Sequence, residues 1–382
     1  MLNFSKVEYK TRFDRLLESM SNLEIDLAII HSPENICYLT GHETPGYYTY
    51  QALIVPIKEK PILLMRVTET ANARIYSDSD MFTFVGYNDM SDPLEETAEV
   101  AAKYLHLDSV VGIEENGWFF SPKSHAQLLK RLSLKNPIVS LDEIINNLRL
   151  VKSPAEIVVI RETARITNMA MRDTISSFRP EQRERDLAAT AFHSLITNGS
   201  DYLSMEPFVA SGPRSGIIHS SWTSRSVAPR EPVLLEMSAT VARYNAPLMH
   251  TIWSESLSSP LMEMSEACLM ARSEMLKEVK PGGSPANAHQ VCKSVIADLG
   301  LAHTYRKRSG YSVGIGFSPD WGEGHILSLK ETEEKLFEVG MVIHVVPTLR
   351  LEGVGGIGYS ATVLVTNSGY EILTSADQTG PS

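Results

Sequence analysis

Glu236, Asn245 and His250 lie among apolar neighbours in the stretch between Leu234 and Trp253, and their chemistry is the first question that the sequence raises. The stretch reads LLEMSATVARYNAPLMHTIW, which predicts two short strands joined by a turn. Polar groups on buried strands normally have hydrogen-bond partners or a function. Glu236 is its one carboxylate, Asn245 is a poor metal ligand, and His250 is equally compatible with simple packing. These residues alone define no metal site.

A second candidate is His219, in the segment SGPRSGIIHSSWTSRSV. Its glycine and proline residues predict a loop, and its serine and threonine residues keep that loop polar. A histidine there could transfer protons near neutral pH. From this segment alone, a surface histidine without a chemical role is the stronger interpretation.

A third candidate segment, residues 306–329, reads RKRSGYSVGIGFSPDWGEGHILSL. Its glycines allow close backbone approach, but they form neither a GxGxxG nor a GxxxxGK[ST] phosphate motif. A long turn with a capping aspartate explains the segment as well as a binding loop does. The polar and aromatic residues that it offers are Tyr311, Asp320, Trp321, Glu323 and His325.

Composition excludes several classes of function. The 382 residues include 35 basic and 46 acidic side chains, for a net charge of −11, which argues against nucleic acid and anionic membranes as partners. Three widely spaced cysteines indicate neither a disulfide framework nor a zinc knuckle. The N-terminus is unlike a signal peptide, and no run of about 18 apolar residues is present, so we expect a cytoplasmic protein. The lack of a GxSxG motif argues against a serine hydrolase of the α/β type.

Two domains must position these residues. Residues 1–150 alternate strand-like and helix-like segments, which predicts an α/β domain with a central sheet. The boundary falls before Ser153, Pro154 and Glu156, the pattern of a capped helix start. Residues 151–382 separate helices from antiparallel strands, which predicts an α+β domain.

Over nearly its full length the chain resembles the creatinase, aminopeptidase P and prolidase family. Its fifth matching segment looks most like the ectoine-hydrolase and creatinase-like branch. The resemblance implies an α/β N-terminal creatinase-type domain, an α+β pita-bread C-terminal catalytic domain and a homodimer. Six segments carry it in the same order: ICYLTGHETPGYYTYQALIVP, VKSPAEI, PFVASGPRSGIIHSSWTSR, EMSATVARYNAPLMHTIW, GYSVGIGFSPDWGEGHI and MVIHVVPTLRLEGVGGIGYSATVLVTNSGYEILT.

The resemblance also identifies five positions that hold metal ligands in the peptidases of the family. Here they are occupied by Glu236, Pro247, Tyr311, Val346 and Ala361. Only the first keeps a carboxylate, and one carboxylate cannot hold a dinuclear metal site. We therefore expect no metal and no other cofactor.

We expect three catalytic residues, and the metal-free creatinase branch implies the role of one of them, His219. A histidine at the position of His219 transfers the proton. Glu236 would hold a cationic substrate or orient that histidine, and Tyr311 would donate to a developing charge. The acids that surround the guanidinium in creatinase correspond to Met249 and Val346 here, which puts creatine itself in doubt.

Further residues are expected to bind the substrate. Arg214 would clamp a carboxylate, and Phe208 and Trp321 would wall the pocket. Tyr47 and Tyr48 would form a lid from the partner's N-terminal domain, although a packed tyrosine cluster is an equally good interpretation. The remaining expected substrate-binding residues are Asn245, His250, Glu323 and His325.

These features predict a metal-independent hydrolase that cleaves a C–N bond in a small amidine, guanidino or cyclic amidine compound. One alternative is a lyase or cyclase of a biosynthetic pathway on the same scaffold. A second is a non-catalytic binding homologue. The weakest is an Xaa-Pro dipeptidase, because it requires the missing metal ligands.

Overall fold

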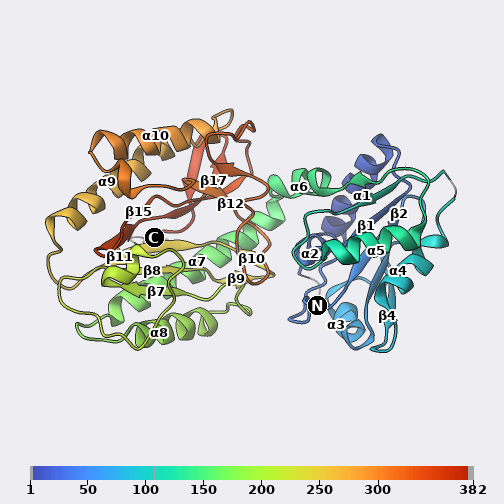
Figure 1. The fold of residues 1–382 in the computed structure, drawn as a ribbon, viewed down its shortest axis with the longest axis horizontal. Coiled ribbons are helices and arrows are strands. Elements are labelled where there is room, and N and C mark those ends of the chain that lie inside the picture. Colours follow the sequence, from blue (N-terminus) through green and yellow to red (C-terminus); the bar gives the residue numbers. More distant parts are fainter. Residues whose placement is uncertain (1–2, 107, 377–382) are drawn as a thin grey trace. The chain divides into compact units, whose positions relative to one another are not determined.

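The computed structural model describes residues 3–106 and 108–376, and the chain divides into two compact units between Arg149 and Leu150 (Figure 1). Each unit has its own sheet structure and its own buried apolar clusters. None of the described helices combines the length and apolar character that a membrane span requires.

The first unit is built on a six-stranded mixed sheet with the order β4-β3-β2-β1-β5-β6. β2 pairs antiparallel with β1 and β3, and the other neighbours are parallel. Apolar residues of α4 and α5 pack against β1 and β2, so these helices cover one face of the sheet. The strands are β1 (Leu27–Ile30), β2 (Ala52–Pro56), β3 (Ile62–Arg66), β4 (Thr83–Tyr87), β5 (Val111–Ile113) and β6 (Val139–Ser140). The helices are α1 (Lys6–Asn22), α2 (Pro33–Thr40), α3 (Thr70–Tyr76), α4 (Pro93–Ala102), α5 (Pro122–Leu132) and α6 (Asp142–Leu150).

The second unit contains two larger sheets and two helix pairs. One sheet has the order β11-β8-β7 and the other the order β13-β12-β14-β17-β18. The strands are β7 (Phe208–Ser211), β8 (Val233–Met237), β11 (Leu248–Ile252), β12 (Gly310–Ser312), β13 (Ser328–Leu329), β14 (Val342–Val345), β17 (Ala361–Thr366) and β18 (Gly369–Ile372). Two hairpins add β9 (Thr240–Val241) with β10 (Tyr244–Asn245), and β15 (Thr348–Leu351) with β16 (Gly355–Gly358).

The helix pairs cover opposite sides of these strands. They are α7 (Pro154–Ser177) with α8 (Glu184–Thr197), and α9 (Ser259–Leu276) with α10 (Pro285–Asp298) (Figure 1). Val233, Leu235 and Leu248 face α7 and α8, whereas Ile343 and Val363 face α9 and α10. Because side chains alternate along a strand, the intervening residues of both sheets face away from the helices. The expected α/β and α+β pita-bread classes are confirmed.

The start of α7 follows the sequence pattern closely. The Ser153 side chain accepts a hydrogen bond from the Glu156 amide, and the Glu156 carboxylate accepts one from the Ser153 amide, which forms a capping box. Pro154 occupies the first turn, where its missing N–H costs no hydrogen bond. Glu156 also accepts a hydrogen bond from the Tyr244 hydroxyl at 2.7 Å, which joins the helix start to β10.

A buried ion pair links the beginning of this unit to the glycine-rich loop, residues 306–329. Lys152 Nζ lies 2.6 Å from Glu323 Oε2, and both side chains are at most 2% exposed. Ser312 Oγ contacts both partners, at 3.3 Å and 3.1 Å. Glu323 was expected to bind substrate, but its carboxylate is engaged in this internal pair, so its role is structural.

We predict that Lys152→Ala destabilises the protein by about 3–5 kcal/mol, because it leaves the Glu323 carboxylate buried without its cation. The free energy of unfolding from urea titration measures the effect. The double variant Lys152→Met with Glu323→Leu is the control and should recover most of the loss, since neither charge remains. An equal loss in the single and double variants would contradict the interpretation.

Candidate active site

The candidate site is organised by a row of three residues that crosses β7, β8 and β11. Phe208 lies opposite Glu236, and Glu236 lies opposite Met249 in the antiparallel pairing. Directly opposed residues share a face of the sheet, here the face that points away from α7 and α8. Met249 packs there with Leu234 and Val346 in a small apolar cluster.

Glu236 is the carboxylate at the centre of this row. Its side chain is buried, with 8% exposure, and it accepts no hydrogen bond from any described residue. Burial raises the pKa of Glu236 to about 6, and the charges of Lys307 and Arg350 limit that rise. A carboxylate with a pKa near neutrality and no hydrogen bond from a described residue can exchange protons with a bound molecule.

Two cations that the sequence interpretation did not assign lie close to this carboxylate. Lys307 precedes β12 and donates from Nζ to Thr348 Oγ1 at 3.2 Å. Burial lowers the pKa of Lys307 to about 8, and Glu236 opposes that shift. Arg350 on β15 donates to the Ser215 carbonyl at 2.6 Å, while its buried Nε has no described partner. The one feature of the sequence that could have indicated Lys307 is the basic run of residues 306–308 in a chain with a net charge of −11.

Tyr311 is the second polar group of the site. Its hydroxyl oxygen accepts a hydrogen bond from Trp321 Nε1 at 3.0 Å and lies 3.0 Å from His344 Nδ1. Burial and the proximity of Glu236 raise the pKa of Tyr311, so the phenol stays protonated. Burial and the nearby cations hold the pKa of His344 well below its usual range, so this imidazole is neutral.

Ser360 decides which nitrogen of His344 carries the proton. Ser360 Oγ lies 2.7 Å from His344 Nε2 and accepts a hydrogen bond from the Met249 amide at 2.6 Å. The buried serine proton has one described acceptor, His344 Nε2, so Nδ1 carries the imidazole proton and donates it to Tyr311. Tyr311 then accepts two hydrogen bonds, and its own proton remains available to the site.

His219 lies in an exposed loop beside the aromatic end of the row. Its ring stacks on Phe208, with centroids 5.9 Å apart and an interplanar angle of 26°, and Trp321 contacts the same phenylalanine edge-on. The backbone of His219 has a φ of +55°, a conformation uncommon for residues other than glycine. The structure therefore brings His219, Phe208 and Trp321 together, next to Glu236 in the strand register.

Arg214 holds this loop in place and differs from its expected role. Its guanidinium pairs with the fully buried Glu184 and donates to the Ser221 carbonyl at 2.6 Å. Glu184 also accepts hydrogen bonds from the amides of Ser211 and Thr223, at 2.8 Å and 2.9 Å. The expected substrate clamp is instead an anchor of the segment that carries His219.

Asn245 and His250 also have roles other than substrate binding. The Asn245 amide group is fully buried, donates to the carbonyls of Arg243 and Gly314, and accepts from Thr240. His250 alternates with Met249 along β11, so it lies off the face that carries Glu236, and its ring contacts Tyr359 at 5.2 Å. Because side chains alternate along a strand, the sequence could have excluded His250 from the face that carries Met249 and Glu236.

The other expected binding residues are His325 in the second unit and Tyr47 and Tyr48 in the first. His325 is exposed in the turn that follows Glu323. Tyr47 and Tyr48 belong to the first unit, where Tyr47 contacts Phe119 edge-on at 5.1 Å and Tyr48 is exposed. A lid function for these tyrosines stays a prediction.

Alternation along β17 corrects one of the five ligand positions. Ala361 was assigned to the last of them, but it packs with Ile343 and Val363 on the side of α9 and α10. Its neighbour Ser360 faces His344 and the Met249 amide, so Ser360 occupies the position toward the site.

The residues present do not fit a metal centre. No group of three or more histidine, cysteine, aspartate or glutamate side chains with ligand geometry occurs among residues 3–106 and 108–376. Both nitrogens of His344 are engaged with hydroxyl groups, and Lys307 and Arg350 place positive charge beside the one carboxylate. A dinuclear cation site requires several anionic oxygen ligands instead.

The fold is the two-domain pita-bread architecture. Residues 12–151 match the creatinase/prolidase N-terminal domain, and residues 159–367 match metallopeptidase family M24. The chain therefore belongs to family M24 and is an enzyme of this hydrolase family.

Relatives within the family carry different printed activities. The chain is 25% identical to ectoine hydrolase from Halomonas elongata, covering 97% of this chain and 96% of that protein. It is 24% identical to Xaa-Pro dipeptidase from Pyrococcus furiosus, covering 97% and 99%. The prolidase structure from Thermococcus sibiricus superposes with a TM-score of 0.86 at 20% identity, covering 98% and 99%, which shows the shared fold.

We predict that Glu236→Gln stabilises the protein at pH 7 by about 1–2 kcal/mol, because the folded state raises the pKa of this carboxyl from 4.5 to about 6. The unfolded chain loses the proton first, so stability of the parent falls as pH rises from about 4.5 through 6. The free energy of unfolding of the variant does not decline over this range, and the values for the two proteins become equal below pH 4.5. Unfolding free energies across this range provide the test, and a destabilised variant at pH 7 would assign Glu236 a structural role.

Proposed function

We propose that this enzyme hydrolyses a C–N bond in a small zwitterionic amidine, guanidino or cyclic amidine compound without a metal ion. One observation carries the proposal: a buried carboxylate without hydrogen-bond partners, Glu236, lies beside two cations, Lys307 and Arg350. Such a site complements a molecule that carries both a positive and a negative group. The likeness to ectoine hydrolase supports the same reaction class.

The residues of the site suffice for the proton transfers of such a hydrolysis. Glu236 removes a proton from water as the water oxygen bonds to the amidine carbon. The free Tyr311 proton donates to the charge that develops on the tetrahedral intermediate. The C–N bond breaks as His219 delivers a proton to the leaving nitrogen. The hydroxyl proton of the intermediate passes to His219 as the carbonyl forms, and Glu236 then releases its proton to solvent.

Charged and aromatic side chains bind different parts of the substrate. Lys307 and Arg350 hold its anionic group, and Phe208 and Trp321 wall the reacting end. The buried Met249 and Val346 exclude water from the floor. We include in the proposal a homodimer in which Tyr47 and Tyr48 of a partner cover the site.

We expect purified enzyme treated with a chelator to release a ring-opened amide from a cyclic amidine acid such as ectoine, as detected by mass spectrometry. Tyr311→Phe should lower kcat about 10²–10³-fold, because it removes one donor to the developing charge. Tyr370→Phe, at a half-exposed position on β18, is the matched control and should leave kcat unchanged. Cleavage of Xaa-Pro dipeptides that appears only with added divalent metal would overturn the proposal.

We also predict a bell-shaped dependence of kcat/KM on pH. The acid limb rises through about pH 6, since Glu236 must lose its proton to act as a base, and the alkaline limb falls through about pH 8, since Lys307 must keep its proton. Lys307→Arg should move the alkaline limb upward, because guanidinium stays charged. An unchanged alkaline limb in this variant would show that Lys307 does not bind the substrate.

A further inference from the structure

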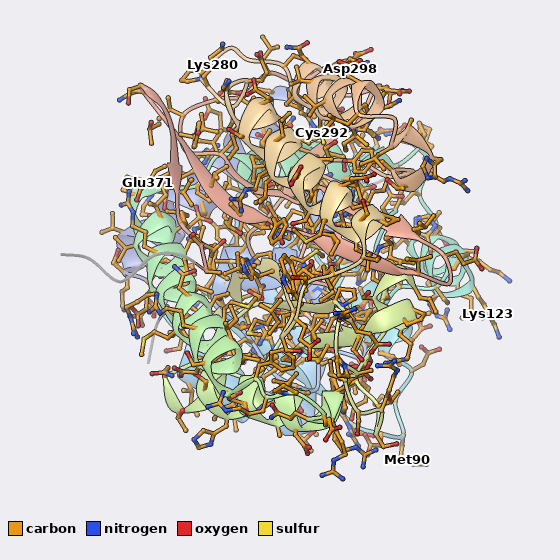
Figure 2. The ribbon with its side chains drawn as sticks, turned by 90° about the vertical axis from the view of Figure 1, so that its left-hand side faces the viewer. Met90, Lys123, Lys280, Cys292, Asp298 and Glu371 are labelled. Carbon is orange, nitrogen blue, oxygen red and sulfur yellow. The ribbon has the colours of Figure 1, made fainter. Side chains whose placement is uncertain are left out.

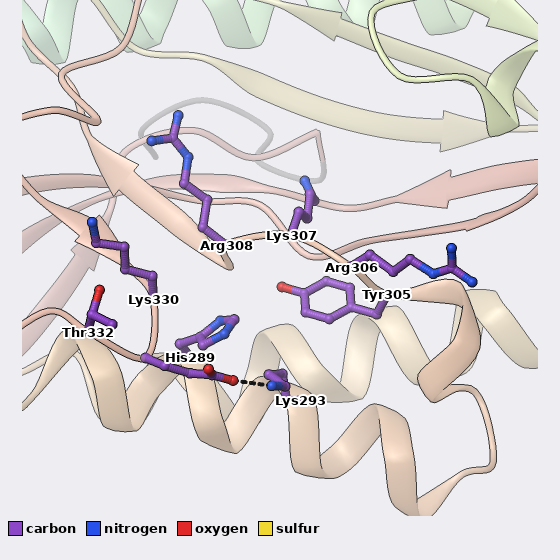
Figure 3. A pocket seen from close by; sticks show the side chains of 9 residues that line it. His289, Lys293, Tyr305, Arg306, Lys307, Arg308, Lys330 and Thr332 are labelled. Atoms are coloured by element: carbon purple, nitrogen blue, oxygen red, sulfur yellow. Dashed lines mark hydrogen bonds and ion pairs between the residues drawn. The ribbon is translucent and has the colours of Figure 1, made fainter.

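A pocket of about 370 Å³ lies between α10 and the segment that precedes β12 (Figure 3). The residues that line it are His289, Lys293, Tyr305, Arg306, Lys307, Arg308, Lys330, Glu331 and Thr332. Its volume lies within the range of small-metabolite sites. Figure 3 shows Lys307, Arg308 and Lys330 extending away from α10, with His289 and Lys293 on the helix below.

Positive charge dominates this pocket. Five of its lining residues are lysine or arginine, and one, Glu331, is acidic. Glu331 forms an ion pair with Lys293, so it does not balance the others. The side chains of Arg306 and Lys330 make no ion pair with any described residue. Such a concentration of cations in a chain with a net charge of −11 favours binding of anions.

The floor of the pocket supplies shape and hydrogen-bonding groups without adding charge. His289 Nδ1 and the Tyr305 hydroxyl lie 2.7 Å and 2.6 Å from Ser309 Oγ. Burial, followed by the charge of Lys293, lowers the pKa of His289, so its imidazole is neutral at pH 7. The free cations at the rim therefore face a neutral floor.

We propose that this pocket binds a small polyanion that carries at least two phosphate or carboxylate groups. Arg306 and Lys330 lie on separate segments, so a ligand with two negative groups can engage both. The site differs from the candidate active site, because Arg306, Lys330 and Lys293 belong to this pocket alone. The inference goes beyond the proposed hydrolysis and does not depend on it.

Two residues connect the pocket to the candidate active site. Lys307 lines the pocket and bonds Thr348, and its charge acts on Glu236. Arg308 lines the pocket and stacks over the Tyr311 ring at 4.4 Å. An anion in the pocket therefore reduces the positive field that acts on Glu236 and Tyr311.

Isothermal titration calorimetry with pyrophosphate and with citrate tests the proposal on the full-length protein. We expect one-to-one binding that weakens with added salt, and at least tenfold weaker binding in the double variant Arg306→Glu with Lys330→Glu. The control double variant changes Lys123 and Lys280 to Glu; both are exposed and neither lines the pocket (Figure 2). It has the same net charge and should bind within twofold of the parent.

Each result decides the proposal. Tighter binding of pyrophosphate identifies phosphate as the preferred group, and tighter binding of citrate identifies carboxylate. Equal weakening of anion binding in both double variants would show that net charge alone causes the effect, and it would overturn the proposed site. Absence of binding at low salt would overturn it as well. Binding lost in Arg350→Ala but kept in Arg306→Glu with Lys330→Glu would place the anion in the active site instead.

Discussion

The proposed chemistry depends on one carboxyl group, that of Glu236, which the fold buries and leaves without a hydrogen bond from any described residue. Glu236 is held in place by strand pairing, because Phe208 and Met249 oppose it on either side. Desolvation alone would neutralise such a carboxyl group. Lys307 and Arg350 keep it ionisable near neutral pH, so its reactivity is set by a balance between burial and charge. Where the resemblance implies metal-binding carboxylates, this chain has Pro247, Val346 and Ser360, and two cations act on the one carboxylate that remains.

Much of the fold was predictable, because its signals are local. The capping box at Ser153 and Glu156 fixed the start of α7 from four consecutive residues. The order of six short segments then placed the remaining strands through family resemblance. Glu236, Tyr311, Phe208 and Trp321 were predicted for the same reason, since each occupies a recognisable segment, and their functional roles stay a prediction.

The rest of the site depends on contacts between distant segments and could not be predicted this way. Lys307 before β12 and Arg350 on β15 act on Glu236 from segments far apart in the sequence, and His344 contacts Tyr311 and Ser360. Arg214 and Asn245 were misassigned because sequence shows a polar residue but not its partner, and both partners are internal. Ala361 was misassigned by one residue, and on a strand a shift of one residue exchanges the two faces.

The pair between Lys152 and Glu323 also bears on how the two units can be separated. The division of the chain lies at residues 149 and 150, whereas the helix cap lies at Ser153. Lys152 belongs to the short link between them, yet its ammonium group supplies the charge that compensates a carboxylate 171 residues away in sequence. The link is therefore a structural part of the catalytic unit, and a fragment that begins at the helix cap would lack the counterion of its own glycine-rich loop. The natural limit for dissecting this protein is upstream of Lys152, at a position that the helix pattern alone does not indicate.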